Sequence, residues 1–267
     1  MKIFTCIKQV PGISEVKIDP KTNTLVREGI PSIMNPHDKH AVELSLNLKE
    51  KHGGEIIALS MGPPQAETVL REALSMGADE AYLLTDRAFA GADTLATSHT
   101  LALAVKKILK DSGDDKYVVI CGVQAIDGDT AQVGPEMAED LNIPQITYVL
   151  KFEIKGNKVI AERAFRAEET VVIETTLPVL ISVVKEINHP RLPKMSGIVD
   201  AYDEKEVIHL DSAYIGAKKE NIGLNGSMTE VWKIFVPERK GAHIILEGTA
   251  EQQVQKLCEH LKEDKVI

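Results

Sequence analysis

The sequence predicts a doubly wound α/β protein with a mostly parallel sheet, an added β-hairpin and a C-terminal helical arm. Before residue 142, four runs rich in Ile, Val, Leu or Ala alternate with stretches of helical spacing, which is typical of a parallel sheet covered by helices. After residue 145 the spacing changes to period two around Gly156-Asn157, which indicates a hairpin. A separate amphipathic stretch near residue 255 supplies the arm.

The first half of the chain contains the parallel part of this sheet. Strands are expected at 2–8, 55–60, 80–84 and 117–121, and helices at 37–51, 65–76 and 92–110. In doubly wound sheets ligands bind beyond the carboxyl ends of the strands. We therefore expect the loops that follow these strands to meet at one edge of the sheet.

The second half is expected to extend or flank that sheet. Phe152 and Ile154 precede the Gly156-Asn157 turn, and period-two spacing resumes after it. Further strands are expected at 171–173 and 179–184, on either side of Pro178. Residues 186–226 have weak periodicity and many turn residues, so we expect loops with a short helix or two.

A last helix is predicted at 250–263. Thr249 and Gln252 have the spacing of a capping box, and Val254, Leu257 and Leu261 continue an apolar stripe that begins at Ala250. A single amphipathic helix must bury its stripe against its own domain or against another chain.

The bulk composition excludes several classes of protein. The chain has 267 residues, 43% of them hydrophobic, and a net charge of −9, which argues against general nucleic-acid binding. It lacks both a run of about 20 apolar residues and a signal-peptide core, so we expect a cytoplasmic protein. Cys6, Cys121 and Cys258 are too widely spaced for a disulfide framework, a metal site or an iron–sulfur motif. Cys6 and Cys121 are expected to be small buried side chains.

The stretch CGVQAIDGDTAQVGPE at 121–136 is the strongest candidate for a binding loop. It follows the apolar strand that begins at Tyr117 and leads into an i, i+4, i+8 stripe of Val133, Met137 and Leu141. Its glycines Gly122, Gly128 and Gly134 permit close approach of the backbone to a ligand. Unpaired N–H groups at the start of that helix would face a phosphate. The alternative is an ordinary turn from a strand to a helix.

This loop has its own chemistry, because it is neither a Walker motif nor the G-x-G-x-x-G of a dinucleotide fold. Asp127 and Asp129 would repel phosphate, so we assign them to backbone N–H groups or to ribose hydroxyls. Thr130, Gln132 and the peptide N–H groups are better phosphate donors. Pro135 lacks an N–H, so a regular helix is expected to begin near it, after an irregular stretch at 128–134.

Several long motifs give the chain a family resemblance. CIKQVP at 6–11, IMNPHDKHAVE at 33–43, MGPPQAE at 61–67, DRAFAGADTLATS at 86–98 and the 121–136 loop occur in this order. Over nearly the whole chain the sequence resembles the β subunit of electron-transfer flavoproteins, which has an adenine-nucleotide-binding fold. The resemblance implies AMP in the simple branch or a second FAD in the electron-bifurcating branch, and the last two motifs favour FAD.

The resemblance, together with the loop chemistry, implies a set of cofactor-binding residues. Asn35 is also placed to cap the helix after Pro36. Asp93 and the hydroxyls that follow it open a helix, where the alternative is an N-cap with hydroxyls facing solvent. His37 and His40 are expected to be bystanders. The expected cofactor-binding residues are Lys8, Gln9, Asn35, Asp38, Met61, Gly62, Asp93, Thr94, Thr97, Cys121, Gly122, Gln124, Ala125, Ile126, Asp127, Gly128, Asp129, Thr130, Ala131, Gln132, Val133 and Gly134.

The resemblance also implies partners and a domain division. Residues 1–226 are expected to form the nucleotide-binding and flavin-binding domain, including the hairpin at 145–175 and a partner loop at 186–204. The expected docking residues are Pro190, Arg191, Leu192 and Pro193, with Leu192 as the apolar anchor. Residues 227–267 would be an arm that packs on the α subunit. The acidic run at 197–204 departs from the lysine-rich run common in relatives, which suggests a dedicated partner with basic residues.

The expected function is electron transfer within a heterodimer. In the bifurcating branch, NADH reduces the β-subunit FAD, and the electrons divide between a low-potential acceptor such as ferredoxin and the α-subunit FAD, which passes them to an acyl-CoA dehydrogenase. No covalent catalytic motif is present, so the chain would hold a flavin and set its potential. The alternatives are a simple carrier with structural AMP and an ATP-binding stress-type protein.

Overall fold

The computed structural model describes residues 1–12, 18–19, 24–25, 31–113, 116–166, 169–232 and 245–267. By its internal contacts the chain divides into two units. The first comprises Met1–Lys17 and Leu25–Trp232, and the second comprises Ile18–Thr24 and Lys233–Ile267. The predicted boundary between residues 226 and 227 stays a prediction.

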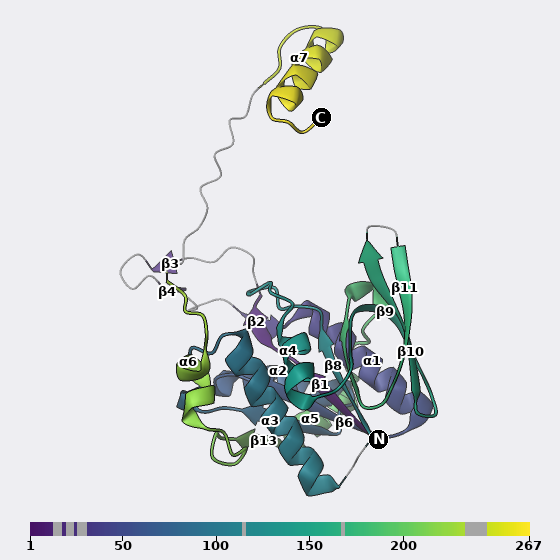
Figure 1. The fold of residues 1–267 in the computed structure, drawn as a ribbon, viewed down its shortest axis with the longest axis vertical. Coiled ribbons are helices and arrows are strands. Elements are labelled where there is room, and N and C mark those ends of the chain that lie inside the picture. Colours follow the sequence, from purple (N-terminus) through teal and green to yellow (C-terminus); the bar gives the residue numbers. More distant parts are fainter. Residues whose placement is uncertain (13–17, 20–23, 26–30, 114–115, 167–168, 233–244) are drawn as a thin grey trace. The chain divides into compact units, whose positions relative to one another are not determined.

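A nine-stranded sheet forms the centre of the first unit, in the order β11-β10-β9-β12-β8-β1-β6-β7-β13 (Figure 1). Neighbours from β9 to β13 in this order are parallel, and β10 is antiparallel to both β9 and β11. The predicted α/β class with a mostly parallel sheet is therefore confirmed. The strands of the sheet are β1 (Lys2–Cys6), β6 (Glu55–Met61), β7 (Glu80–Leu84), β8 (Tyr117–Gly122), β9 (Gln145–Lys155), β10 (Lys158–Arg166), β11 (Glu169–Thr176), β12 (Val179–Val183) and β13 (Val207–Leu210).

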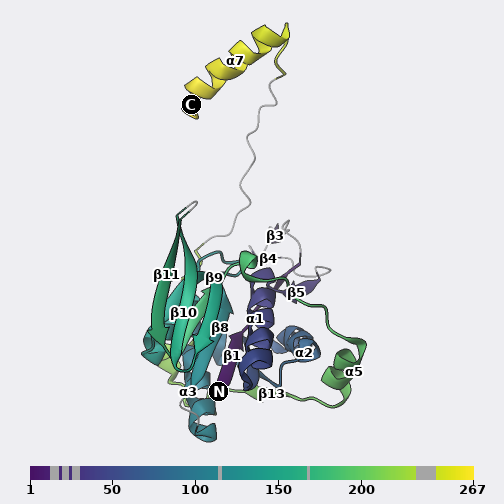
Figure 2. The ribbon, with the colours of Figure 1, turned by 90° about the vertical axis from the view of Figure 1, so that its right-hand side faces the viewer.

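Helices cover both faces of the sheet. The helices α1 (Pro36–His52) and α2 (Glu67–Met76) bury their apolar residues on one face, whereas α3 (Thr94–Ser112) and α4 (Val133–Leu141) pack on the other (Figure 2). Every residue of β1 is buried, as expected for a strand with helices on both sides. The core thus consists of two layers separated by the sheet.

The predicted and observed elements differ mainly at their ends. β1 ends at Cys6, because Gln9–Pro11 forms a separate strand, β2, that pairs antiparallel with β5 (Ser32–Met34). The helix expected at 65–76 begins as a 3₁₀ turn, η1 (Pro64–Ala66), before α2. α4 begins at Val133, so Pro135 lies in its first turn rather than at its start. A proline is tolerated there because those N–H groups have no intrahelical partner.

The hairpin extends the main sheet. Gly156-Asn157 joins β9 to β10, and the first residues of β9 pair parallel with β12. Tyr148 has a φ of 56°, and the register between β9 and β12 shifts between Ile181 and Val183. This irregularity lies where β9 leaves β12 and continues beside β10.

The stretch 186–226 contains more regular structure than the sequence predicts. The helix α5 (Met195–Asp203) packs on α2, and Arg71 of α2 donates to the carbonyl of Lys205 at 2.8 Å. β13 was not predicted, because its burial alternates irregularly over only four residues. The remaining short elements are η2 (Arg87–Phe89), η3 (Lys185–Ile187), η4 (Lys219–Asn221), α6 (Gly223–Gly226), β3 (Ile18–Asp19) and β4 (Thr24–Leu25).

The predicted C-terminal helix is present as α7 (Ala250–Glu263). Thr249 and Gln252 form the expected capping box. The described residues of its own unit bury no residue of α7. The described residues contain no helix with the length and apolar character needed to cross a membrane.

Candidate functional site

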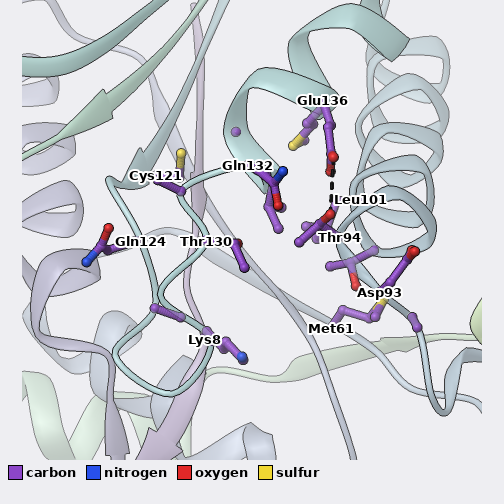
Figure 3. A pocket seen from close by; sticks show the side chains of 18 of the residues that line it. Lys8, Met61, Asp93, Thr94, Leu101, Cys121, Gln124, Thr130, Gln132 and Glu136 are labelled. Carbon is purple, nitrogen blue, oxygen red and sulfur yellow. Dashed lines mark hydrogen bonds between the residues drawn. The ribbon is translucent and has the colours of Figure 1, made fainter. Parts of the chain in front are cut away.

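A cavity of about 820 Å³ opens at the carboxyl edge of the parallel strands. The ends of β1, β6 and β8 lead into it, and the N-termini of α3 and α4 form its opposite side (Figure 3). This placement follows from the topology, because parallel strands direct all their carboxyl-end loops to one edge. The volume lies in the upper part of the range of about 300–1,000 Å³ that is typical of small-molecule sites.

Most of the residues expected to bind the cofactor line this cavity. The exceptions are Gln9, Gly62, Ile126 and Asp127. Gln9 is directed elsewhere, because its amide donates to the carbonyl of Gln65 at 2.8 Å and to the hydroxyl of Thr68 at 2.9 Å. Asp127 forms an ion pair with Lys8, with Nζ 2.8 Å from Oδ1. The lining residues named from the sequence are Lys8, Asn35, Asp38, Met61, Asp93, Thr94, Thr97, Cys121, Gly122, Gln124, Ala125, Gly128, Asp129, Thr130, Ala131, Gln132, Val133 and Gly134.

Asn35 does not cap α1 with its side chain, contrary to expectation. Its amide is fully buried and bonds instead to the 121–134 loop, with Nδ2 donating to the carbonyl of Gln124 at 2.9 Å. The N–H of Ile126 donates to its Oδ1 at 3.2 Å. The side chain therefore acts like a peptide group that bonds to the loop, and the carbonyl of Asn35 accepts from Asp38 at the start of the helix.

The loop between β8 and α4 is rich in unused donors. The hydrogen bonds found in the described chain engage none of the backbone N–H groups of Thr130, Ala131 and Gln132. Asp129 and Ala131 have left-handed φ angles of 54° and 55°, a conformation that costs on the order of 1 kcal/mol for a residue with a Cβ. Such strain typically gathers at ligand-binding loops, and these amides lie beside the N-terminus of α4, which favours an anion.

The glycines of this loop serve different purposes. A Cβ on Gly122 would lie 2.3 Å from Oδ1 of Asp38, and one on Gly134 would lie 3.0 Å from Sγ of Cys121. The space beside Gly122 is therefore taken by the chain's own atoms, whereas a Cβ on Gly134 would require a small shift of the Cys121 side chain. A Cβ on Gly128 would meet nothing within 4 Å. Gly128 lines the cavity and has open space beside it.

Asp93 begins α3 and also holds a distant segment. Its Oδ1 accepts from the N–H of Ala96 at 3.0 Å, as predicted for an N-cap. Its Oδ2 accepts from the N–H groups of Met228 and Thr229 at 2.8 and 2.9 Å. Burial alone would raise the pKa of Asp93, but these hydrogen bonds outweigh it and lower the pKa. Asp93 is thus held as a carboxylate whose oxygens are engaged by the protein.

Glu136 brings an unpaired carboxyl oxygen into the cavity wall. The hydroxyl of Thr94 donates to its Oε1 at 3.1 Å (Figure 3), whereas its Oε2 is buried and has no partner among the described residues. Burial, and then the nearby charge of Asp93, raise the pKa of Glu136. No signal in the sequence marks this residue beyond its place at the end of the 121–136 stretch.

Part of the cavity lining is apolar. It includes Phe89, Leu101 and Met137, together with the predicted Met61. Val231 joins them from the segment after α6. Sequence reasoning missed Phe89, Leu101 and Val231, because helix-spaced apolar residues look like ordinary core and Val231 lies far away in the chain. One cavity thus combines unpaired backbone amides with apolar side chains.

Two thiols that line the cavity lie on adjacent strands, with Cys6 buried and Cys121 partly exposed. Cys6 and Cys121 are paired in the register of β1 and β8. Burial, and then the charge of Asp38, raise the pKa of Cys6 to about 12. Burial also raises the pKa of Cys121. Both therefore remain protonated at neutral pH and act as small apolar side chains, as expected.

The expected docking segment is fixed at one residue and exposed at the next. Arg191 donates from Nε to Oε2 of Glu43 at 2.9 Å and also pairs with Glu50. Leu192 is 88% exposed. The side chain proposed as the apolar anchor thus projects from a backbone that is tied to α1.

The sequence comparisons agree with this geometry. A family model described as the electron transfer flavoprotein domain matches residues 22–211. A protein named electron transfer flavoprotein subunit beta from Thermoanaerobacterium thermosaccharolyticum is 52% identical over 267 residues, which is 100% of both chains. The caffeyl-CoA reductase-Etf complex subunit CarD of Acetobacterium woodii is 49% identical, and the acryloyl-CoA reductase electron transfer subunit gamma of Anaerotignum propionicum is 40% identical. Both alignments cover 100% of each chain.

The layered sheet and its cavity are therefore those of an electron transfer flavoprotein domain, a fold that serves flavin-based electron transfer. Within that class, this chain belongs to the family of electron-transfer flavoprotein β subunits. This membership sets aside the alternative of an ATP-binding stress-type protein.

Proposed function

We propose that the chain binds FAD in the cavity at the carboxyl edge and serves an electron-bifurcating electron-transfer flavoprotein. The observation that carries this proposal is one cavity of about 820 Å³ whose lining includes both the unpaired backbone donors at Thr130–Gln132 and the apolar side chains of Phe89 and Leu101. FAD has both kinds of chemistry, with a diphosphate at its centre and a flat ring at one end. AMP is smaller and has no second ring to contact the apolar side chains.

The residues divide naturally between the parts of FAD. The amides of 130–132 and the N-terminus of α4 would hold the diphosphate. Met61, Phe89 and Leu101 would exclude water from the ring, and the unpaired oxygen of Glu136 is available to a ribityl hydroxyl or a ring N–H. When bound, FAD supplies hydride acceptance and one-electron transfer, while the chain sets its potential by burial, charge and hydrogen bonding.

The proposed route of electrons follows the bifurcating branch. NADH would be the donor, ferredoxin or a similar low-potential carrier would be one acceptor, and a second FAD on the α subunit would receive the other electron. An acyl-CoA dehydrogenase would then be reduced. Support comes from the relatives whose names refer to caffeyl-CoA reductase and acryloyl-CoA reductase. The free Cys6, Cys121 and Cys258 suit a reducing cytoplasm, the proposed location.

Two surfaces are proposed to meet partners. The described residues of its own unit leave the apolar stripe of α7 unburied, and membership in the β-subunit family supports packing of this stripe on the α subunit. Leu192 is exposed beside α5, whose Asp200 and Asp203 are also exposed. This combination suits a dehydrogenase that presents an apolar pocket with a basic rim.

The bound molecule provides the decisive test. The chain would be co-purified with its α subunit, heat-denatured, and the released ligands quantified by chromatography. We expect two FAD per heterodimer and reduction of one of them by NADH. One FAD and one AMP per heterodimer would instead indicate the simple carrier. One FAD per heterodimer with neither a second FAD nor AMP would reject the proposed site in this chain.

A charge-matched pair of variants tests the docking surface. Neutralising Asp200, Asp203 and Glu204 together should weaken binding of the dehydrogenase without changing FAD content. The control neutralises Glu139, Glu220 and Glu230, which are also exposed but lie elsewhere. Equal affinity of both triple variants for the dehydrogenase would contradict the proposed acidic docking surface.

A further inference from the structure

Asp38 connects the two central strands at the cavity through their backbones. It lies in the first turn of α1 and is 5% exposed. Its Oδ2 accepts from the N–H of Lys8, just beyond β1, at 2.8 Å. Its Oδ1 accepts from the N–H of Gly122, the last residue of β8, at 3.1 Å. One carboxylate therefore bonds to the ends of two neighbouring strands.

The residue opposite this carboxylate has to be glycine. A Cβ on Gly122 would lie 2.3 Å from Oδ1 of Asp38 and 2.7 Å from Cβ of His37. Asp38 thus occupies the space that any other side chain at position 122 would need. Three residues earlier, Asn35 bonds to the next part of the same loop. The start of α1 therefore holds the 121–134 loop at several successive points.

We propose that Asp38 is a positioning residue, whose carboxylate fixes the spacing of the β1 and β8 ends and so the shape of the cofactor cavity. Both oxygens are engaged by backbone N–H groups, so Asp38 acts on the cofactor through Lys8 and Gly122 rather than as a ligand contact. The inference rests on the proposed function and assigns to Asp38 a role different from cofactor binding.

The arrangement requires the ionised carboxylate. A proton on either oxygen would point at an N–H donor or remove an acceptor, and one of the two bonds would be lost. The titratable groups that face Asp38 are Lys8, which pairs with Asp127, and the protonated thiols of Cys6 and Cys121. His37 is adjacent in the chain, and burial lowers its pKa. None of these groups forms an ion pair with Asp38 within the described chain.

The environment therefore places the titration of Asp38 in the physiological range. Burial raises its pKa to about 7, against the hydrogen bonds from Asn35, Lys8 and Gly122. We expect FAD affinity to fall about tenfold as the pH falls from 8 to 6, which corresponds to the loss of about one hydrogen bond, or 1.4 kcal/mol.

The test uses the full-length chain and FAD as the probe. FAD affinity is measured by calorimetry at pH 6, 7 and 8 for the wild type, Asp38→Asn and Asp79→Asn. Asp38→Asn carries an NH₂ donor in place of one carboxylate oxygen, so one of the two N–H groups loses its acceptor at every pH. We therefore expect binding about tenfold weaker at pH 8 and independent of pH. Asp79 also accepts a strand N–H, from Ile56 at 2.8 Å, but at the other edge of the sheet. Its variant should keep wild-type affinity and the wild-type pH slope.

The outcomes separate the two proposals. A wild-type chain that binds AMP but not FAD would reject the proposed cofactor, whereas the same loss of AMP affinity in Asp38→Asn would still support the positioning role. If the wild type binds FAD and Asp38→Asn binds it equally tightly, the positioning role is overturned but the proposed cofactor is not. If that variant does not fold, the wild-type profile decides, because an affinity that is constant from pH 6 to 8 overturns the inference.

Discussion

The two edges of the parallel sheet treat charge differently. At the amino edge, Lys2 pairs with Glu55 at 2.6 Å, and Asp79 accepts both the N–H of Ile56 and the ammonium group of Lys49, at 2.8 and 2.5 Å. At the carboxyl edge, Asp38 accepts two backbone N–H groups, and no cation among the residues that the structure describes is paired with it.

The difference indicates that the amino edge contributes to the stability of the fold, whereas the carboxyl edge forms the candidate binding site. Opposite charges at the amino edge satisfy each other. At the carboxyl edge, Asp38 and Asp93 are held by backbone amides, other amides at 130–132 have no partner in the described chain, and the loops line a cavity. The same chemical group, an aspartate that accepts the N–H of a residue at a strand end, thus serves stability at one edge and the geometry of a site at the other.

The largest expected effect is a pH dependence of stability that arises from one edge only. The pKa of Asp38 is raised by burial from 3.8 to about 7 in the folded chain. Its stabilising contribution is therefore fully present below about pH 4 and lost as the pH rises through about 7. The free energy of unfolding should fall by up to about 4 kcal/mol over this range. Denaturant titrations at pH 5 and 8 measure it.

Asp38→Asn should remove this slope, while Asp79→Asn should keep it. Stability and FAD affinity would then respond to pH in opposite directions, since ionised Asp38 is costly to bury but is needed by the loops. If the wild type and Asp38→Asn lost stability equally between pH 5 and 8, Asp38 would not be the group responsible.

Gly122→Ala should cause the next largest effect. The new Cβ would overlap Asp38 and the backbone of His37, which lies 2.8 Å away. We expect a loss of about 3 kcal/mol in stability together with loss of FAD. Gly128→Ala is the matched control, because it has open space around its Cβ and should change stability by less than about 0.5 kcal/mol. Thermal unfolding of the two variants gives the comparison, and similar melting temperatures would refute it.

Ala131→Gly tests the strain at the carboxyl edge. Ala131 has a φ of 55°, which glycine adopts without a steric penalty, although glycine also raises the entropy of the unfolded chain. We expect a net stabilisation of up to about 1 kcal/mol in the absence of cofactor. Ala125→Gly in the same loop is the control, because Ala125 has no positive φ. A lower melting temperature for Ala131→Gly than for wild type would show that the strain is not significant.

Lys49→Met should have the smallest effect and tests the amino edge. It removes the cation from Asp79 but retains the apolar stem of the side chain. Both partners are about one-third exposed, so solvent screening limits the expected loss to about 0.5 kcal/mol. Urea unfolding at low and high salt measures it. A loss of unfolding free energy in Lys49→Met that exceeds the loss in Gly122→Ala would reverse the proposed contrast between the edges.

The sequence predicted the parts of the fold whose periodicity is uninterrupted. The strands at 55–60 and 80–84 and the helix at 250–263 were placed almost to the residue. β13 was missed because a short edge strand has few buried positions to produce a pattern. The nearby α5 was expected only as a short helix of unspecified position.

For the candidate site, the sequence identified the loops but not how their side chains bond to one another. That Asp127 and Asp129 avoid phosphate stays a prediction, and their side chains pair with those of Lys8 and Gln124 rather than with the expected backbone N–H groups. Pairings between residues more than a hundred positions apart, such as Asp93 with Met228, are set by tertiary packing and leave no local pattern. The same limit hid apolar residues of the cavity lining, such as Phe89 and Val231.

The bonds between Arg191 and α1 have a consequence for molecular recognition. Arg191 reaches Glu43 from both its backbone N–H and its guanidinium, and Glu43 is nearly buried. The neighbouring Leu192 is therefore presented from an immobilised backbone before any encounter takes place. When a protein binds Leu192, the backbone of this segment therefore loses little conformational entropy. A small contact area can then still give useful affinity with rapid release.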